Sequence, residues 1–210
     1  MEAFVRLEGI AAPLLRSNID TDQIIPAKYL VRVSYAGIGE GLFAGWRLRA
    51  DGSPDPDFIL NRTPWNKSVI LLADSNFGCG SSREGAPKAL RDWGIRSVIA
   101  PSFGNIFFSN CFRNGLLPVE LPIEQIRAIA QQVESSAGAG NVCVDLQAQT
   151  VTSAQGEVFT FHSPERLRRM LLEGLDEIDL TLTLSAEIER FRGADRIKRP
   201  WAYGHGQRAR

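Results

Sequence analysis

The stretch LLADSNFGCGSSREGAP, residues 71–87, decides the fold of this chain. It begins inside a short apolar run, SVILLAD (68–74), whose flanking turn residues predict a buried strand. A glycine-rich turn follows, and SREGAPKALRDWG (82–94) has the pattern of a helix. A strand that ends in a glycine-rich turn and opens a helix is typical of an α/β protein.

The same alternation continues along the chain. SVIAPS (97–102) predicts a strand, GNIFFSNCFRNG (104–115) a helix and LLPVEL (116–121) a further strand. This βαβαβ unit is expected to form a right-handed parallel sheet, and sites in such sheets lie at the carboxyl ends of the strands. The three phenylalanines of the second helix are expected to pack against that sheet.

Shorter elements are expected on both sides of this core. They are a pair of strands over 4–15, a long loop over 37–66, a helix over 122–138, a hairpin over 141–162 around Gly156, and a helix capped by Ser163 and Pro164. Because no internal repeat or low-complexity linker interrupts the pattern, residues 1–199 are expected to form one domain and residues 200–210 a flexible C-terminal tail.

Composition excludes several classes of function. The chain has 210 residues, of which 44% are hydrophobic, and 24 basic residues balance 24 acidic ones. A neutral chain of this kind lacks the basic surface that binding to nucleic acid or to an anionic membrane requires. The N-terminal segment carries Glu2 and Glu8 and has too short an apolar stretch for a signal peptide. We therefore expect a soluble, cytoplasmic protein.

Cysteine and histidine are scarce. Cys79, Cys111 and Cys143 are the three cysteines, no CxxC pair occurs, and only two histidines are present. These numbers argue against a disulfide framework, a zinc site or an iron–sulfur cluster held by this chain alone.

The glycine-rich turn can be compared with three known motifs. A phosphate-binding P-loop needs a lysine after its last glycine, but Ser81 follows Gly80 and the next lysine is Lys88. A dinucleotide fingerprint needs a small residue where Arg83 stands. The G-x-S-x-G elbow of serine hydrolases is missing from the sequence.

The turn instead has the groups that bind a carboxylate. Backbone amides of Gly78, Gly80, Ser81 and Ser82 can point to one spot at a helix N-terminus, and Arg83 adds a forked cation. Spacing alone leaves another interpretation open, in which the glycines only permit a tight turn and the serines cap the helix.

Three motifs in their order resemble a known family. NIDTDQIIP (18–26), NFGCGSSRE (76–84) and PSFGNIFFSNCFRNGLLPVEL (101–121) closely resemble the small subunits of bacterial 3-isopropylmalate dehydratase, the swivelling domain of the aconitase superfamily. The resemblance extends from about residue 4 to about residue 195 and includes PDF (56–58).

This resemblance implies both a fold and a reaction. The fold is a swivelling β/β/α domain with a parallel βαβαβ core sheet, an additional antiparallel hairpin and flanking helices. The reaction isomerises 2-isopropylmalate and 3-isopropylmalate through isopropylmaleate in leucine biosynthesis, with a small dicarboxylic acid as substrate. A large subunit carries a four-iron four-sulfur cluster, so this chain binds no cofactor itself and is active only with that partner.

The family's catalytic residues match the glycine-rich turn. The resemblance implies that Ser81, as an alkoxide, removes the carbon-bound proton, while Ser82 and Arg83 contact the substrate. Since a C–H next to a carboxylate is a very weak acid, the base must be strong, and amides such as that of Gly80 would stabilise it.

The first motif contributes a second set of candidates. Asp22 matches the aspartate that lines the site in the superfamily. Thr21 is a candidate for contact with the substrate, although Thr21 and Asp20 are more simply explained as residues that shape the turn.

The segment PAKYLVRV (26–33) corresponds to the family's specificity loop. Leu30 and Val31 are candidates for contact with the isopropyl group, with the alternative that they belong to the core. Arg32 would instead favour a charged substituent and hence an aconitate-like acid.

One position departs from the family. REGAP places Gly85 where the usual REHAP has histidine, which removes a polar side chain near the serine and lowers helix propensity by up to about 1 kcal/mol. The departure keeps two alternatives open: a paralogue acting on another alkylmalate or an aconitate-like acid, and a non-catalytic domain that binds a carboxylate or a partner.

Overall fold

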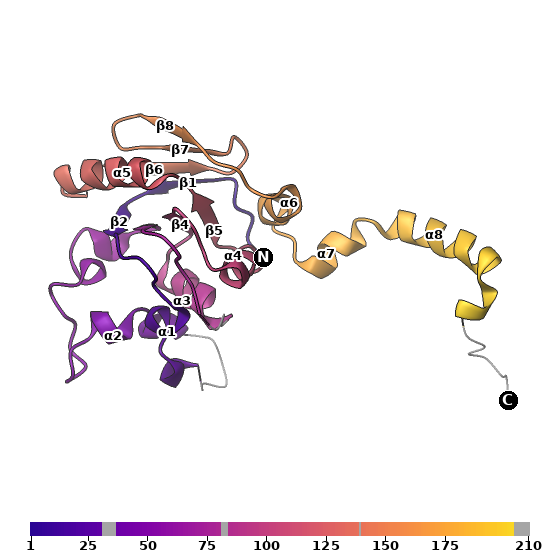
Figure 1. Ribbon diagram of the computed structural model, residues 1–210, viewed down its shortest axis with the longest axis horizontal. Coiled ribbons are helices and arrows are strands. Elements are labelled where there is room, and N and C mark those ends of the chain that lie inside the picture. The colour runs from indigo at the N-terminus through magenta and orange to yellow at the C-terminus, as the bar shows by residue number, and fades with distance from the viewer. Residues whose placement is uncertain (31–36, 81–83, 139, 204–210) are drawn as a thin grey trace.

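The computed structural model describes residues 1–30, 37–80, 84–138 and 140–203, and this part of the chain builds two four-stranded sheets (Figure 1). One sheet is parallel, with its strands in sequence order. Its members are β2 (Ala11–Leu14), β3 (Ile70–Ala73), β4 (Ser97–Ala100) and β5 (Leu117–Glu120). The predicted α/β fold with a parallel βαβαβ core is therefore confirmed.

Helices cover both faces of the parallel sheet. The face that Leu71 and Ala73 enter packs against α3 (Gly85–Trp93) and α4 (Asn105–Arg113). The opposite face, which Ile70 and Leu72 enter, packs against α5 (Ile123–Ser135), α6 (Glu165–Glu173) and the second sheet. Because both faces are buried, the strands are mostly apolar and do not alternate between apolar and polar residues. As expected, the phenylalanines of α4 pack in these cores, with Phe107 and Phe112 fully buried.

The second sheet is antiparallel, in the order β1-β6-β7-β8. Its strands are β1 (Arg6–Gly9), β6 (Val142–Asp145), β7 (Thr150–Thr152) and β8 (Val158–Thr160). Val142, Val144 and Val151 face the core while their neighbours are partly open to solvent, as in a sheet with one wet face. The hairpin predicted around Gly156 is β7–β8, and β6 adds a third strand to it.

Two expectations need correction. Residues 4–15 do form two strands, but β1 pairs with β6 and β2 with β3. Only Ile10 separates them, too little for a hairpin turn, and its carbonyl accepts from Val69 and Ile70 as the chain passes from one layer to the next. Ser163 does not cap α6, because Pro164 is the N-cap and no side chain caps that end.

Short helices complete the structure, and the C-terminal ones leave the body. Figure 1 shows α7 (Glu177–Leu182) and α8 (Ser185–Lys198) projecting away from both sheets. The remaining helices are α1 (Thr21–Ile24), α2 (Ala44–Arg47) and the 3₁₀ turns η1 (Ala27–Tyr29), η2 (Ile38–Gly41), η3 (Ile59–Asn61), η4 (Trp65–Lys67) and η5 (Pro200–Ala202). Within the described residues, no helix combines the length and apolarity needed to cross a membrane.

Candidate functional site

The turns after β2 and β3 are bonded to each other. The Thr21 N–H donates to the Cys79 carbonyl at 3.1 Å, and the Gly78 N–H donates to the Ile19 carbonyl at 2.7 Å. Asp20 and Cys79 pair as an isolated parallel bridge beyond the ends of the sheet. The first motif and the glycine-rich turn are thus held side by side by backbone groups.

The turn after β4 joins them from the other side. The Phe77 N–H donates to the Ser102 carbonyl at 3.0 Å, and the Gly104 N–H donates to the Phe77 carbonyl at 2.9 Å. Side chains add to this network: the Asn76 N–H donates to Ser102 Oγ at 2.9 Å, and Asn76 Nδ2 donates to Asn18 Oδ1 at 2.8 Å. All three motifs identified in the sequence therefore meet at one edge of the parallel sheet.

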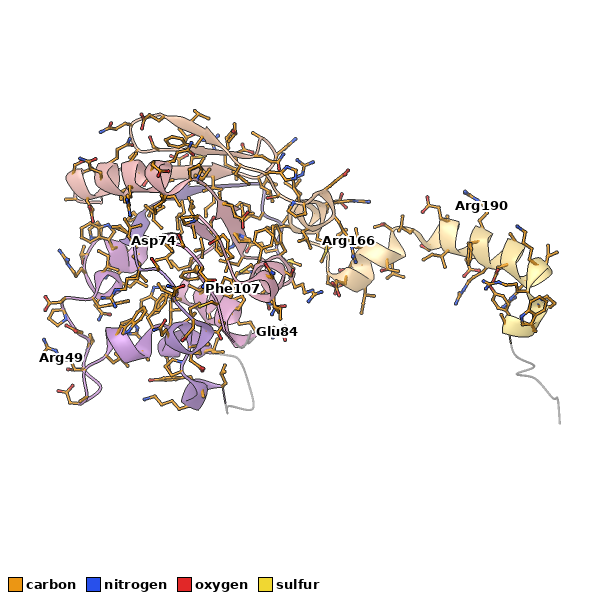
Figure 2. The ribbon with its side chains drawn as sticks, viewed as in Figure 1. Arg49, Asp74, Glu84, Phe107, Arg166 and Arg190 are labelled. Atoms are coloured by element: carbon orange, nitrogen blue, oxygen red, sulfur yellow. The ribbon has the colours of Figure 1, made fainter. Side chains whose placement is uncertain are left out.

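Glycine is required where these turns approach α4. Gly78 has φ 72°, and a Cβ on it would lie 2.2 Å from Cγ of Phe107, whose ring lies in the interior in Figure 2. A Cβ on Gly104 would lie 2.5 Å from the Gly78 carbonyl oxygen. A pocket of about 240 Å³ opens here, lined by Gly78, Gly80, Gly104, Asn105, Ile106 and Phe107.

The N-terminus of α1 shows what the first motif does. Asp20 accepts from the Gln23 N–H at 2.7 Å, and the Gln23 side chain accepts from the Asp20 N–H at 2.9 Å, which forms a capping box. Asp20 therefore shapes the turn. Thr21 is buried, whereas Asp22 is exposed in the first turn of the helix.

The predicted site residues fall into two groups. Ser81, Ser82, Arg83, Val31 and Arg32 lie outside the described residues. Of the others, Gly80 lies beside the start of α1, since a Cβ on it would be 3.6 Å from Cβ of Asp20. The structure thus brings Gly80 next to the first turn of α1, which begins at Thr21 and includes Asp22.

Leu30 reaches the same helix end from another direction. Its Cδ2 would lie 2.3 Å from a Cβ on Gly85, and Ile38 Cδ1 is the next neighbour at 3.6 Å. Leu30 is half-buried and packs against the core. Its side chain therefore occupies the space that any side chain at position 85 would need, so the glycine and the leucine depend on each other.

Two titratable groups near these turns have shifted pKa values. Hydrogen bonds from the Ser75 N–H and hydroxyl lower the pKa of Asp74, which follows β3 (Figure 2). Complete burial raises the pKa of the Cys111 thiol in α4. Across the described ranges, no three side chains among His, Cys, Asp and Glu gather closely enough to hold a metal ion.

A larger pocket, of about 620 Å³, opens beside β2 and the loop that contains PDF (56–58). Its charged lining consists of Arg16, Asp55, Asp57, Arg62 and Glu134. Because these charges have mixed signs and the glycine-rich turn lines only the smaller of these two pockets, the smaller pocket is the better candidate for binding a carboxylate.

Sequence reasoning missed the residues that join the turns. Asn18, Asn76 and Ser102 lie inside the quoted motifs, but only the pairing of the strands shows that they meet. Asn105 and Ile106 also line the pocket, and Ile106 is 62% exposed at the start of α4. The sequence signal for this part of the pocket was a large apolar residue, Ile106, just after Gly104, the N-cap of α4.

Comparisons with known proteins identify relatives along nearly the whole chain. Residues 1–124 match the model of the aconitase C-terminal domain. The 3-isopropylmalate dehydratase small subunit of Cupriavidus necator is 52% identical over 208 residues, 98% of this chain and 100% of that protein. The one from Roseobacter denitrificans is 48% identical, covering 96% and 100% respectively.

A solved structure shares the fold as well. The crystal structure of 3-isopropylmalate dehydratase from Methanocaldococcus jannaschii aligns with a TM-score of 0.63 and 25% identity, covering 88% of this chain and 98% of that one. Relatives that are about 50% identical along nearly the whole chain, together with the meeting of the three motifs at one edge of the parallel sheet, show that this chain belongs to the family of 3-isopropylmalate dehydratase small subunits.

Proposed function

We propose that this chain is the small subunit of a cytoplasmic hydro-lyase that interconverts 2-isopropylmalate and 3-isopropylmalate through isopropylmaleate in leucine biosynthesis. The observation that carries the proposal is the 52% identity, over nearly the full length of both chains, to a small subunit of that enzyme. The meeting of three motif turns at the carboxyl edge of the parallel sheet supports it, because this is where α/β sheets bind ligands.

The partner is a large subunit that carries the four-iron four-sulfur cluster. When bound there, the cluster supplies the Lewis acid that the leaving hydroxyl requires. The residues of this chain do not suit a cluster of their own: it has three cysteines, and Cys111 is fully buried. The small subunit then closes the site from the opposite side.

Ser81 is the proposed base. It takes the proton from the carbon next to a carboxylate, and the return of that proton completes the hydration direction. Its position in the chain supports this role, because residues 81–83 stand between the Gly80 turn and the first turn of α3. The N-cap side chain of α3, Glu84, makes no capping bond, which leaves the helix N-terminus to stabilise negative charge.

Arg83, Ser82 and Asp22 are proposed to bind and orient the substrate. Arg83 would grip a carboxylate with two parallel hydrogen bonds. Asp22 is exposed in the first turn of α1, which the Thr21 bond to Cys79 holds against the glycine-rich turn. This bond keeps the turn that carries Asp22 next to the glycine-rich turn.

Leu30 is proposed to set the preference for an alkyl substituent, together with Val31. Its contact with Gly85 supports this assignment because it holds an apolar side chain next to the start of α3. An apolar pocket separates alkyl groups by only about 1–3 kcal/mol per methylene, so several alkylmalates should react at graded rates.

Mixing experiments test the proposal. The purified chain and a purified large subunit of 3-isopropylmalate dehydratase are assayed separately and together for hydration of isopropylmaleate. Activity should require both chains. A mixture that forms a complex yet fails to turn over would favour the non-catalytic alternative instead.

Arg32 and Gly85 support an alternative in which the substrate is an aconitate-like acid, because Arg32 would favour a charged substituent and Gly85 departs from the family's usual histidine. Rates with methyl-, isopropyl- and carboxymethyl-substituted malates should favour the alkyl compounds. A preference for the tricarboxylic acid that Arg32→Leu abolishes would contradict the assignment to leucine biosynthesis. Gly85→His should be made both alone and with Leu30→Ala, since Leu30 fills the space that the histidine needs.

A further inference from the structure

The C-terminal arm, defined here as residues 176–203, is almost fully exposed. From Thr181 to Tyr203, all residues are exposed except Ile188, Asp195 and Tyr203. Figures 1 and 2 show α8, which carries Arg190, standing clear of the sheets. A single helix of 14 residues is marginal in water without tertiary packing, so the arm needs a partner surface to be stable.

Apolar side chains gather on this arm. Leu184, Ile188 and Phe191 recur at helical spacing and form one stripe along α8, and Ile178 and Leu182 form another on α7. Phe191 is 64% exposed and Leu182 61%. Among the described residues, more than half of the large exposed hydrophobic side chains belong to the arm: Ile178, Leu182, Leu184, Phe191, Ile197 and Trp201.

The far end of the arm is held in a defined shape. Arg199 Nε and Nη2 donate to the two carboxylate oxygens of Asp195 at 2.7 and 2.8 Å, and the Tyr203 hydroxyl donates to Asp195 Oδ2 at 2.8 Å. Arg196 lies over the Tyr203 ring at 5.3 Å. These contacts form a compact cluster at the C-terminal end of α8.

The charge of the arm indicates which class of partner it can bind. The arm carries six acidic and five basic side chains, a net charge of −1. Nucleic acid or an anionic membrane would need an excess of basic residues. A protein surface with an apolar groove fits these side chains best.

The root of the arm is continuous with the candidate site. Glu177 of α7 accepts from Arg113 of α4 at 3.0 Å. Arg113 ends the nine-residue α4, and the other end of that helix lines the pocket with the exposed Ile106. The two ends are about 13 Å apart. A partner that closes over the pocket therefore lies within reach of the arm.

We propose that the arm docks the large subunit, with the stripe of Leu184, Ile188 and Phe191 buried in an apolar groove of that partner. The inference depends on the proposed function only for the identity of the partner. The arm acts on affinity, since its stripe lies on a helix outside the body that forms the pocket.

Surface variants of the full chain test this inference. Leu184→Ser combined with Phe191→Ser should weaken binding to a purified large subunit about 100-fold, measured by titration calorimetry. Val158→Ser is the matched control, because Val158 is 61% exposed on β8 of the antiparallel sheet, and it should leave binding unchanged. At saturating large subunit, turnover of the double variant should match that of the wild type.

The outcomes separate this inference from the proposed function. An unchanged dissociation constant for the double variant would overturn the role of the arm even in a fully active enzyme. Loss of self-association, measured by sedimentation without any loss of affinity for the large subunit, would identify a second copy as the occupant and also overturn it. Activity of the wild-type mixture tests the proposed function separately.

Discussion

The two sheets show how differently one chain can use its strands. The parallel sheet is buried on both faces, and the turns beyond β2, β3 and β4 are bonded to one another by backbone groups and by Asn76. The antiparallel sheet keeps one wet face and ends in a simple turn at Gly156. A site that must hold several polar groups in place needs turns supported from both sides, and within the described ranges the parallel sheet is the one that provides them.

The largest expected effect is the loss of the proposed base. Ser81→Ala should lower turnover of the assembled enzyme by about 10³-fold or more with little change in fold, because the base acts only in the transition state. Thr160→Ala removes an exposed hydroxyl from the antiparallel sheet and should change nothing. Steady-state rates with isopropylmaleate measure both variants. Near wild-type turnover in Ser81→Ala would remove Ser81 from its assigned role.

Two glycines provide the sharpest comparison of stability. Gly78 and Gly156 both have positive φ, but a Cβ on Gly78 would clash with Phe107, whereas one on Gly156 meets no atom within 4 Å. Gly78→Ala should cost about 2–5 kcal/mol of unfolding free energy and Gly156→Ala about 1 kcal/mol. Chemical denaturation of the isolated chain gives both values. Equal costs would contradict the tight packing beneath the glycine-rich turn.

A smaller effect is expected at the proposed carboxylate clamp. Arg83→Lys keeps the charge but loses the fork, so the KM should rise by about tenfold while kcat changes little. Arg6→Lys, at an exposed position of β1, is the matched control in the antiparallel sheet. A fall in kcat without a change in KM would place Arg83 in the chemical step.

The smallest effect leaves activity untouched. Cys111 is fully buried under the parallel sheet, and burial raises the pKa of its thiol, whereas Cys143 is half-buried in β6. Because the thiolate is the reactive form, an alkylating reagent at neutral pH should label Cys143 and spare Cys111 until the protein unfolds. Mass spectrometry of digests reports both sites, and early labelling of Cys111 would mean that its core opens readily.

Local patterns predicted the parts of the fold that depend on neighbouring residues. The succession from β3 to β5 follows from apolar runs, glycines and helical spacing, and it is confirmed. Strand partners could not be predicted in this way, because β1 pairs with residues 142–145, far along the chain. The strand partners of residues 4–15 could therefore be assigned only once both sheets were known.

The candidate site, like the fold, could be predicted from the sequence only where it depends on neighbouring residues. The glycine-rich turn was recognisable because its backbone requirement is local, and Gly78 and Gly80 meet it with positive φ. The bond between Asn76 and Asn18 depends on β2 lying next to β3, which no short motif encodes. The exposure of the C-terminal arm could not be predicted either, because an apolar stripe at helical spacing has the same sequence pattern whether it is buried or exposed to solvent.

The separation between β1 and β6 also has a consequence during synthesis. Leu7 pairs with Val144, 137 residues later, so the first strand has no partner for most of translation. At about 5–20 residues per second, this wait lasts roughly 7–27 s. Throughout that interval the nascent chain carries an unpaired strand edge, of the kind that invites pairing with other chains. Faster elongation or a bound chaperone should therefore raise the yield of soluble protein without changing the stability of the finished fold.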